Sequence, residues 1–214
     1  MSEAAPGLPD SPVFATAERS ELASAIRVLI DTAMTAEDVD GATLLEVARG
    51  AEELAARLGG PVERGPGYQP RSHGDYLPRS PVVGEASPLA PRIDWAPDPD
   101  GGVTAHGTFG AAYEGPPGYV HGGWVACAFD ELLGIANITA GHPGMTGRLT
   151  IHYRRPTPLF RPLRLRAWVE RTEGRRIMTR GEMWVDDVLT AEADGVFVQP
   201  RPALAAQYFG SPEG

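Results

Sequence analysis

The chain has one stretch typical of a buried central helix and, after it, several stretches that alternate apolar and polar residues with a period of two. The alternation is clear in residues 149–153 and 163–170. It continues in 177–185 and 188–198, which we predict to be a hairpin around Asp186-Asp187. A strand with a single apolar face belongs in an antiparallel sheet that is covered on one side.

Two shorter candidate strands, 92–96 and 103–113, precede a helix that we predict over residues 122–136. Only one long apolar helix is available to cover the sheet. The expected fold is therefore α+β, with an antiparallel sheet wrapped around a central helix.

The first ninety residues have a different character. We expect residues 1–15 to be disordered and residues 16–60 to form a helical extension, in which Asp40 caps a second helix. Residues 61–91 are rich in Pro and Gly and predict a linker or arm with little regular structure. The main domain is expected over residues 92–202, followed by a tail over residues 203–214.

The charge balance excludes some classes of function. The net charge of −9 at pH 7 argues against general nucleic-acid binding, which needs a basic face. No apolar run is long enough for a membrane span, and the acidic N-terminus is unlike a signal or transit peptide. With Cys127 as the single cysteine, a reducing compartment is expected, and we predict a cytoplasmic protein. No histidine spacing indicates a metal site, and we expect no cofactor.

A His-Gly-Gly turn, residues 121–123, stands directly before the predicted helix, and Asp130 follows nine residues after the histidine. The backbone N–H groups at a helix start lack internal partners and carry the positive end of the helix dipole. Donors of this kind stabilise the oxyanion that forms when a carbonyl is hydrolysed, and a carboxylate can assist the attack. The same residues also fit an ordinary junction between a loop and a helix with an acid at the surface.

The rise of a helix places Asp130 about 12 Å from Gly122 along the axis. A reacting carbonyl must lie about 3 Å from both its oxyanion donor and its base or nucleophile. One helix therefore cannot supply both groups to one substrate. If the two residues cooperate, the carboxylate comes from a second copy of the chain, and a two-fold dimer provides two such sites.

Three stretches carry a resemblance to a known family: residues 114–123 (EGPPGYVHGG), residues 129–134 (FDELLG) and residues 145–156 (MTGRLTIHYRRP). They resemble the hotdog-fold acyl-CoA thioesterases, in particular the PaaI-like branch and the mammalian thioesterase-superfamily members. The resemblance covers residues 92–200. It implies a hotdog domain that assembles as a dimer or a dimer of dimers and hydrolyses an acyl-CoA thioester without a metal.

The resemblance also implies roles for individual residues. Asp130 is expected to activate the hydrolytic water or to attack the thioester directly, and Gly122 to donate the oxyanion N–H. Gly123 gives clearance for the substrate. His121 orients the turn or contacts the thioester carbonyl, and Thr146 positions the water and the carboxylate.

By the same resemblance, coenzyme A contacts fall on His152, Arg164 and Arg175, although His152 replaces a more usual Asn. Guanidinium groups suit the diphosphate and the ribose phosphate of coenzyme A. Ten of the 19 basic residues lie between Arg148 and Arg180, and for most of them a solvated strand position is the better interpretation. Gly115 stands where many PaaI-like enzymes carry an Asn, which argues against aryl-acetyl substrates.

Two other functions compete with the thioesterase. A hotdog hydratase or dehydratase would carry a His five residues after the helix Asp, and this chain has Ile135 there. The second competitor is a non-catalytic acyl-CoA-binding protein or scaffold that uses its N-terminal helices to bind a partner. The sequence favours an acyl-CoA thioesterase with an acyl-CoA substrate.

Overall fold

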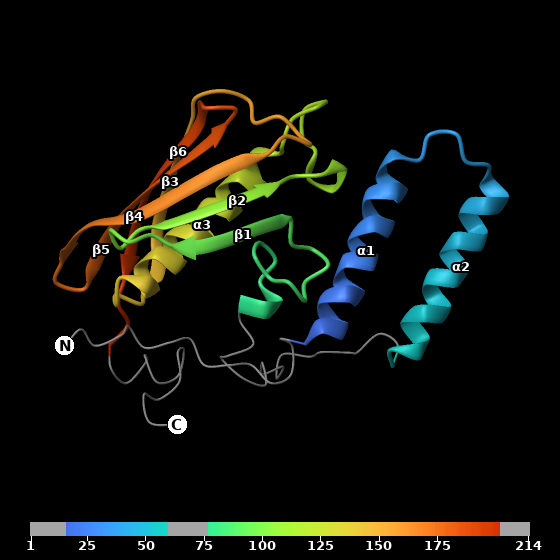
Figure 1. The fold of residues 1–214 in the computed structure, drawn as a ribbon, viewed down its shortest axis with the longest axis horizontal. Helices are drawn as coiled ribbons and strands as arrows, with labels where there is room; N and C mark the ends of the chain where they lie inside the picture. Colours follow the sequence, from blue (N-terminus) through green and yellow to red (C-terminus); the bar gives the residue numbers. More distant parts are fainter. Residues whose placement is uncertain (1–15, 60–76, 202–214) are drawn as a thin grey trace.

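The structure is a computed structural model, and it describes residues 16–59 and 77–201. One antiparallel sheet of six strands forms the body, in the order β1-β2-β4-β5-β6-β3 (Figure 1). The strands are β1 (Arg92–Pro97), β2 (Val103–Thr108), β3 (Met145–Tyr153), β4 (Leu163–Glu173), β5 (Arg176–Val185) and β6 (Val188–Val198). The α+β hotdog architecture predicted from the sequence is confirmed.

The helix α3 (Gly122–Thr139) lies along the concave side of the sheet and contacts β2, β3, β4, β5 and β6 (Figure 1). Its core-facing side includes Phe129 and Leu133, both fully buried, and these pack against inward residues of the strands such as Leu165 and Phe197. The opposite side of α3 is only partly buried, and Asp130 lies on it. One face of the central helix is thus left less covered than the other.

The turns explain where the strands stop. Asp186 and Asp187 join β5 to β6 with φ angles of 49° and 62°, which are the left-handed values that two-residue hairpins require.

The predicted strand over residues 103–113 was too long, because β2 ends at Thr108 and Ala111–Tyr113 forms a short 3₁₀ turn, η3. The chain turns there to bring Tyr113 into the core, where its side chain is 7% exposed.

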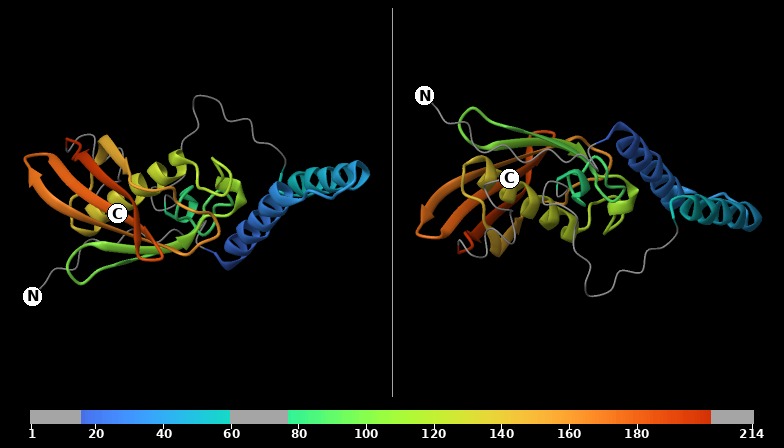
Figure 2. Two further views of the ribbon diagram at one scale, coloured as in Figure 1. Left: turned by 90° about the horizontal axis from the view of Figure 1, so that it is seen from above. Right: turned by 90° about the horizontal axis from the view of Figure 1, so that it is seen from below.

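Two helices precede the sheet. The helix α1 (Ala17–Thr35) contacts η3, and Ala23 on it is buried. The helix α2 (Gly41–Arg57) has Asp40 as its N-cap, as the sequence predicted. The Asp40 carboxylate accepts hydrogen bonds from the N–H groups of Ala42 and Thr43. No residue of α2 is buried, and both helices project from the body (Figures 1 and 2).

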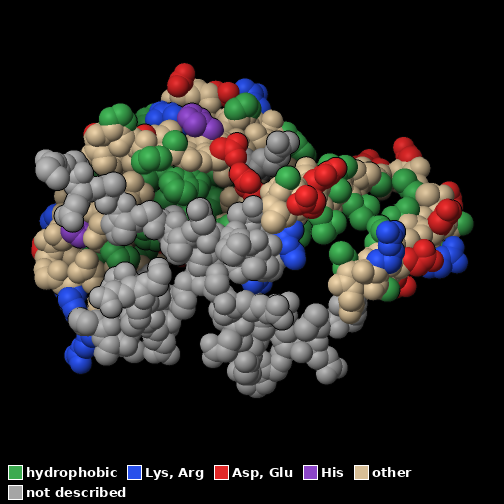
Figure 3. Space-filling view, turned by 60° about the horizontal axis from the view of Figure 1, so that its bottom comes forward, with side chains coloured by type: hydrophobic (Ala, Val, Ile, Leu, Met, Phe, Trp, Pro, Cys, Tyr) green, Lys and Arg blue, Asp and Glu red, His purple; other side chains and the backbone are tan. Residues whose placement is uncertain are grey.

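The apolar residues of this helical pair remain largely exposed. Hydrophobic side chains appear along its surface with many acidic side chains between them (Figure 3). Leu45 and Leu58, both on α2 or at its end, are 66% and 68% exposed. Within the described residues, α2 therefore has little tertiary contact to stabilise it.

Part of the predicted linker, residues 77–91, is irregular yet closely packed. It contains the 3₁₀ turn η2 (Leu77–Arg79), and Val82 and Ala90 are 2% and 1% exposed. The buried hydroxyl of Ser80 accepts from the N–H groups of Val82 and Val83 and so holds the next turn. The segment is joined to α1 by a hydrogen bond that the Arg27 guanidinium donates to the Ser87 carbonyl. The remainder of the predicted linker lies outside the described residues, as do residues 1–15 and the whole predicted tail, residues 203–214.

No helix among residues 16–59 and 77–201 is long and apolar enough to cross a membrane.

Candidate active site

A tight loop leads into α3. Its ends meet in a bridge between Glu114 and Val120, and the Gly115 N–H donates to the Tyr119 carbonyl at 2.9 Å. The Glu114 carboxylate accepts from the Gly118 N–H at 2.7 Å, and Gly118 adopts a φ of 80° that favours glycine. The loop is thus fixed by its own backbone and by one acid.

Gly115 lies against the residue that starts the helix. A Cβ at Gly115 would be 2.7 Å from the His121 Cα, so the Asn of many PaaI-like enzymes would not fit unless the loop shifted. In the sequence, Gly115 at this position argued against aryl-acetyl substrates. The structure adds the reason, because the space is taken by His121 itself.

His121 is the N-cap of α3. Its Nδ1 accepts from the Gly123 N–H at 3.0 Å, and its own N–H donates to the Tyr113 carbonyl at 2.8 Å. The His121 carbonyl accepts from the Trp124 N–H, as the first turn of a helix requires. The side chain of His121 therefore orients the turn, which is one of the two roles that the resemblance implied.

The N–H of Gly122 has no acceptor among the described residues. It lies at the positive end of the helix dipole, where an anionic oxygen is favoured. A Cβ on Gly122 would lie 3.3 to 3.5 Å from the hydroxyl and ring atoms of Tyr153. Glycine, which has no Cβ, leaves that space free. Gly122 is the residue with an available donor, whereas the Gly123 N–H is already engaged.

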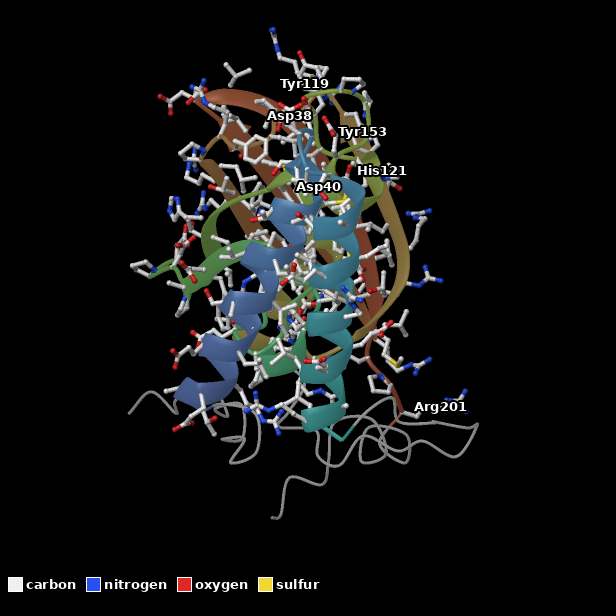
Figure 4. The ribbon with its side chains drawn as sticks, turned by 90° about the vertical axis from the view of Figure 1, so that its right-hand side faces the viewer. Asp38, Asp40, Tyr119, His121, Tyr153 and Arg201 are labelled. Carbon is white, nitrogen blue, oxygen red and sulfur yellow. The ribbon has the colours of Figure 1, made fainter. Side chains whose placement is uncertain are left out.

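Tyr153 was missed in the sequence as a site residue. Its hydroxyl donates to the Gly122 carbonyl at 2.8 Å, and in Figure 4 its side chain lies at the same end of the molecule as His121. A signal was present, because Tyr153 continues the face of β3 that carries Leu149 and Ile151, and that face points toward the helix. The last inward residue of this strand reaches the start of α3.

Asp130 lies two turns further along α3, partly buried. Its Oδ1 accepts a hydrogen bond from the Thr146 hydroxyl at 2.8 Å. Thr146 stands near the start of β3, where the register with β6 shifts between Thr146 and Arg148. One carboxylate oxygen is thus held by a hydroxyl, and the other has no partner among the described residues.

The register separates the two halves of the candidate site. Tyr153 lies opposite Ala191, at one end of β6, whereas Met145, the neighbour of Thr146, lies opposite Val198 at the other end. Gly122 is therefore at one end of β3 and Asp130 is toward the opposite end. Both belong to one rigid helix, so their separation of about 12 Å within the chain is fixed.

The predicted coenzyme A residues do not gather in one subunit. Arg164 alternates with buried residues of β4, so it lies on the outer face of the sheet, where its guanidinium stacks over the Trp184 ring at 5.5 Å. His152 contacts the Asp194 carboxylate at 3.2 Å. Arg175 is in the turn between β4 and β5, at the opposite end of the sheet from Arg164, and donates to the Gln199 carbonyl.

Cys127 lies on the partly buried side of α3, close to Asp130 and Glu131. Burial raises the pKa of its thiol, and the charges of Glu131 and Asp130 raise it further. The protonated thiol is a poor nucleophile. The carboxylate of Asp130 is the stronger candidate for chemistry on this face. No group of three potential metal ligands occurs among residues 16–59 and 77–201.

The comparisons with known proteins decide the family. Residues 117–192 match the model of the thioesterase superfamily. A crystal structure of a thioesterase superfamily protein aligns with a TM-score of 0.75 and 33% identity, over 86% of this chain and 96% of that one. This chain belongs to the thioesterase superfamily.

Curated relatives of this thioesterase-superfamily chain match a shorter region. The acyl-coenzyme A thioesterase THEM4 of Xenopus laevis is 34% identical over 95 residues, and that of Mus musculus is 32% identical over 95 residues. These matches cover 44% of this chain, and 43% and 41% of the two relatives. The chain thus matches less than half of the length of these relatives.

Proposed function

We propose that this protein hydrolyses an acyl-CoA thioester to the free acid and coenzyme A. The observation that carries the proposal is the pair of groups on α3: an N–H at Gly122 without an acceptor, and an Asp130 carboxylate held by Thr146. The likeness to two acyl-coenzyme A thioesterases supports the choice of substrate. The buried Ile135 stands where a hotdog dehydratase would have its histidine, which disfavours that reaction.

In the proposed reaction the thioester carbonyl oxygen accepts a hydrogen bond from the Gly122 N–H. The helix dipole stabilises the negative charge that develops on that oxygen. Asp130 takes a proton from a water that attacks the carbonyl carbon, or attacks that carbon itself. When water attacks, the C–S bond then breaks to give the free acid, and the thiolate takes up the proton that Asp130 accepted. When Asp130 attacks, breaking of the C–S bond leaves a mixed anhydride, which a water hydrolyses to the free acid and the Asp130 carboxylate. His121 and Tyr153 keep the first turn of α3 in place.

The site is proposed to form between two copies of the chain, because one helix holds the two groups about 12 Å apart. A two-fold axis beside the less buried face of α3 would bring the Gly122 end of one helix to Asp130 of the other. The homodimer, the cytoplasmic location and the coenzyme A contacts of His152, Arg164 and Arg175 belong to this proposal. Gly123, without a side chain, leaves room for the substrate.

Release of free thiol from a panel of acyl-CoAs tests the proposal. Asp130→Asn should lower turnover by about a hundredfold or more, on the scale of losing a general base. Asp187→Asn is the matched control, because this exposed turn residue adopts a backbone conformation that asparagine tolerates. Activity of Asp130→Asn within about threefold of the parent would remove Asp130 from the mechanism.

A non-catalytic acyl-CoA-binding protein is the competing function, and the exposed apolar surface of α1 and α2 is the observation that favours it. Such a protein would bind acyl-CoA but release no thiol over many turnovers. The same thiol assay therefore separates the two functions.

A further inference from the structure

A cavity of about 450 Å³ lies between α1 and the body of the protein. Ile30 and Met34 line it from α1, and Leu89 and Ala90 from the packed segment before β1. Its volume is within the range of about 300 to 1,000 Å³ that is typical of small-molecule sites. Arg27 and Asp31 are the only charged residues among those that line it.

The rim of this cavity is unusually apolar for an exposed surface. Four of its lining residues, Val28, Met34, Leu89 and Phe160, are 64%, 61%, 60% and 61% exposed. Single exposed hydrophobic side chains are common, but a group around one opening indicates a binding surface. The four come from three separate segments of the chain, so the tertiary structure brings them together.

Phe160 also has a strained backbone. Its φ of 57° is rare for a bulky residue, and its N–H donates to the Phe109 carbonyl at 2.9 Å, which helps to hold the conformation. Strain of this kind is found most often at functional sites. Here it keeps an aromatic side chain at the mouth of the cavity.

The cavity adjoins the candidate active site. Tyr113 and Trp124 form its inner wall, and their rings make an edge-to-face contact with centroids 5.0 Å apart. The Tyr113 carbonyl accepts from the His121 N–H, and Trp124 stands two residues after Gly122 in the first turn of α3. The first turn of α3, which begins at Gly122, thus contributes to this wall through Trp124.

We infer that this cavity binds the acyl group of the thioester, so that α1 helps to select the substrate. The inference rests on the proposed function. The apolar lining and rim fit a straight-chain acyl group of medium length, such as decanoyl, and leave an acetyl or butyryl group mostly uncovered. Each further methylene that is buried strengthens binding, so a longer chain gains more from the cavity than a short one. The extension before the sheet is then a part of the enzyme that determines specificity.

The test fills the cavity from α1. Ser24 lines the cavity and is exposed enough to accept a larger side chain, and its neighbour Ala25 is exposed but does not line it. Ser24→Phe should lower kcat/KM for decanoyl-CoA at least tenfold relative to butyryl-CoA. Ala25→Phe, the matched control, should leave that ratio within twofold of the parent. Val28→Trp, at the rim, should lower the same kcat/KM ratio as Ser24→Phe does. The second variant keeps the test valid if Ser24→Phe fails to fold.

A binding measurement separates failure of this inference from failure of the proposed function. If no acyl-CoA is hydrolysed, the proposed function fails, and calorimetric titration with decanoate still probes the cavity. Binding that is weakened by Ser24→Phe and kept by Ala25→Phe supports the cavity as the acyl site. Equal chain-length ratios and equal decanoate affinities in the two variants would overturn it. A change of oligomeric state in Ser24→Phe with an unchanged chain-length ratio would also overturn it, because the cavity would then be an interface between copies.

Discussion

The hydroxyl of Tyr153, the last residue of β3, donates a 2.8 Å hydrogen bond to the carbonyl of Gly122, the first residue of α3. The bond joins the end of an edge strand to the helix start that carries the available N–H. It fixes the peptide that follows Gly122 and covers one side of the glycine with an aromatic ring. The first turn of α3 is thus tied to a residue 31 positions away in sequence.

Tyr153→Phe should lower kcat/KM for acyl-CoA by about three- to tenfold, the scale of one hydrogen bond worth about 0.5–1.5 kcal/mol. The ring packing is kept, and Tyr153 is 55% exposed, so the melting temperature should change little. Tyr119→Phe is the control, because Tyr119 is also exposed and lies in the loop before the helix. Equal activities of the two variants would mean that the Tyr153 hydroxyl does not orient the turn.

Thr146→Val should reduce turnover more than Thr146→Ser, because only serine keeps a hydroxyl for the Asp130 carboxylate. We expect a loss of tenfold or more in kcat for valine and less than threefold for serine, with little change in KM. Thr150→Val, at an exposed position on the same strand, serves as the control. If valine and serine behave alike, Thr146 has no part in positioning the carboxylate.

The composite site is tested by mixing two inactive subunits, Asp130→Ala and Gly122→Val. In a heterodimer, one site receives both changes and the other receives an intact Gly122 and an intact Asp130. Activity should return to at most half of the parental value, measured on heterodimers purified with two different tags. Heterodimers as inactive as the two parents would show that the residues do not meet across an interface.

Arg164 and Arg175 lie at opposite ends of the sheet in one subunit, so their contributions are best measured singly. If both contact the nucleotide of coenzyme A, Arg164→Gln and Arg175→Gln should each raise KM for acyl-CoA but not for an acyl-pantetheine. Arg148→Gln is an exposed control on β3. Equal effects of a substitution on both substrates would exclude that arginine from nucleotide binding.

Burial and the nearby Asp31 charge raise the pKa of Tyr113 to about 12, and its hydroxyl donates to the Leu89 carbonyl. The unfolded chain loses this proton near its ordinary pKa of about 10, whereas the folded protein keeps it until about 12. The stabilisation is therefore complete below pH 10 and is lost as the pH rises through 12. Denaturant unfolding at pH 9 and pH 11.5 should show a smaller loss of stability in Tyr113→Phe than in the parent. An equal loss in the two proteins would exclude Tyr113 as the source of the fall in stability between pH 9 and pH 11.5.

The sequence by itself determined the strands, the central helix and the His-Gly-Gly turn, because periodicity, caps and turn residues are local properties. It also placed Asp130 on the same helix as Gly122, since helical rise is constant. It overestimated the strand after Val103, because Tyr113 gains more by entering the core than by continuing the sheet. Packing of Tyr113 in the core outweighs the local preference for a strand there.

The tertiary structure decided what depends on distant residues. The contact of Tyr153 with Gly122 requires the register of β3 with β6, and the bond between Thr146 and Asp130 requires the helix to lie across that strand. The placement of His152 relative to Arg164 follows from strand order, because β5 and β6 lie between β3 and β4, and alternation alone does not give that order. The cavity beneath α1 exists because three separate segments converge there. Long-range packing sets these relations; alternation shows that Tyr153 faces the helix but does not show which helix residue it meets.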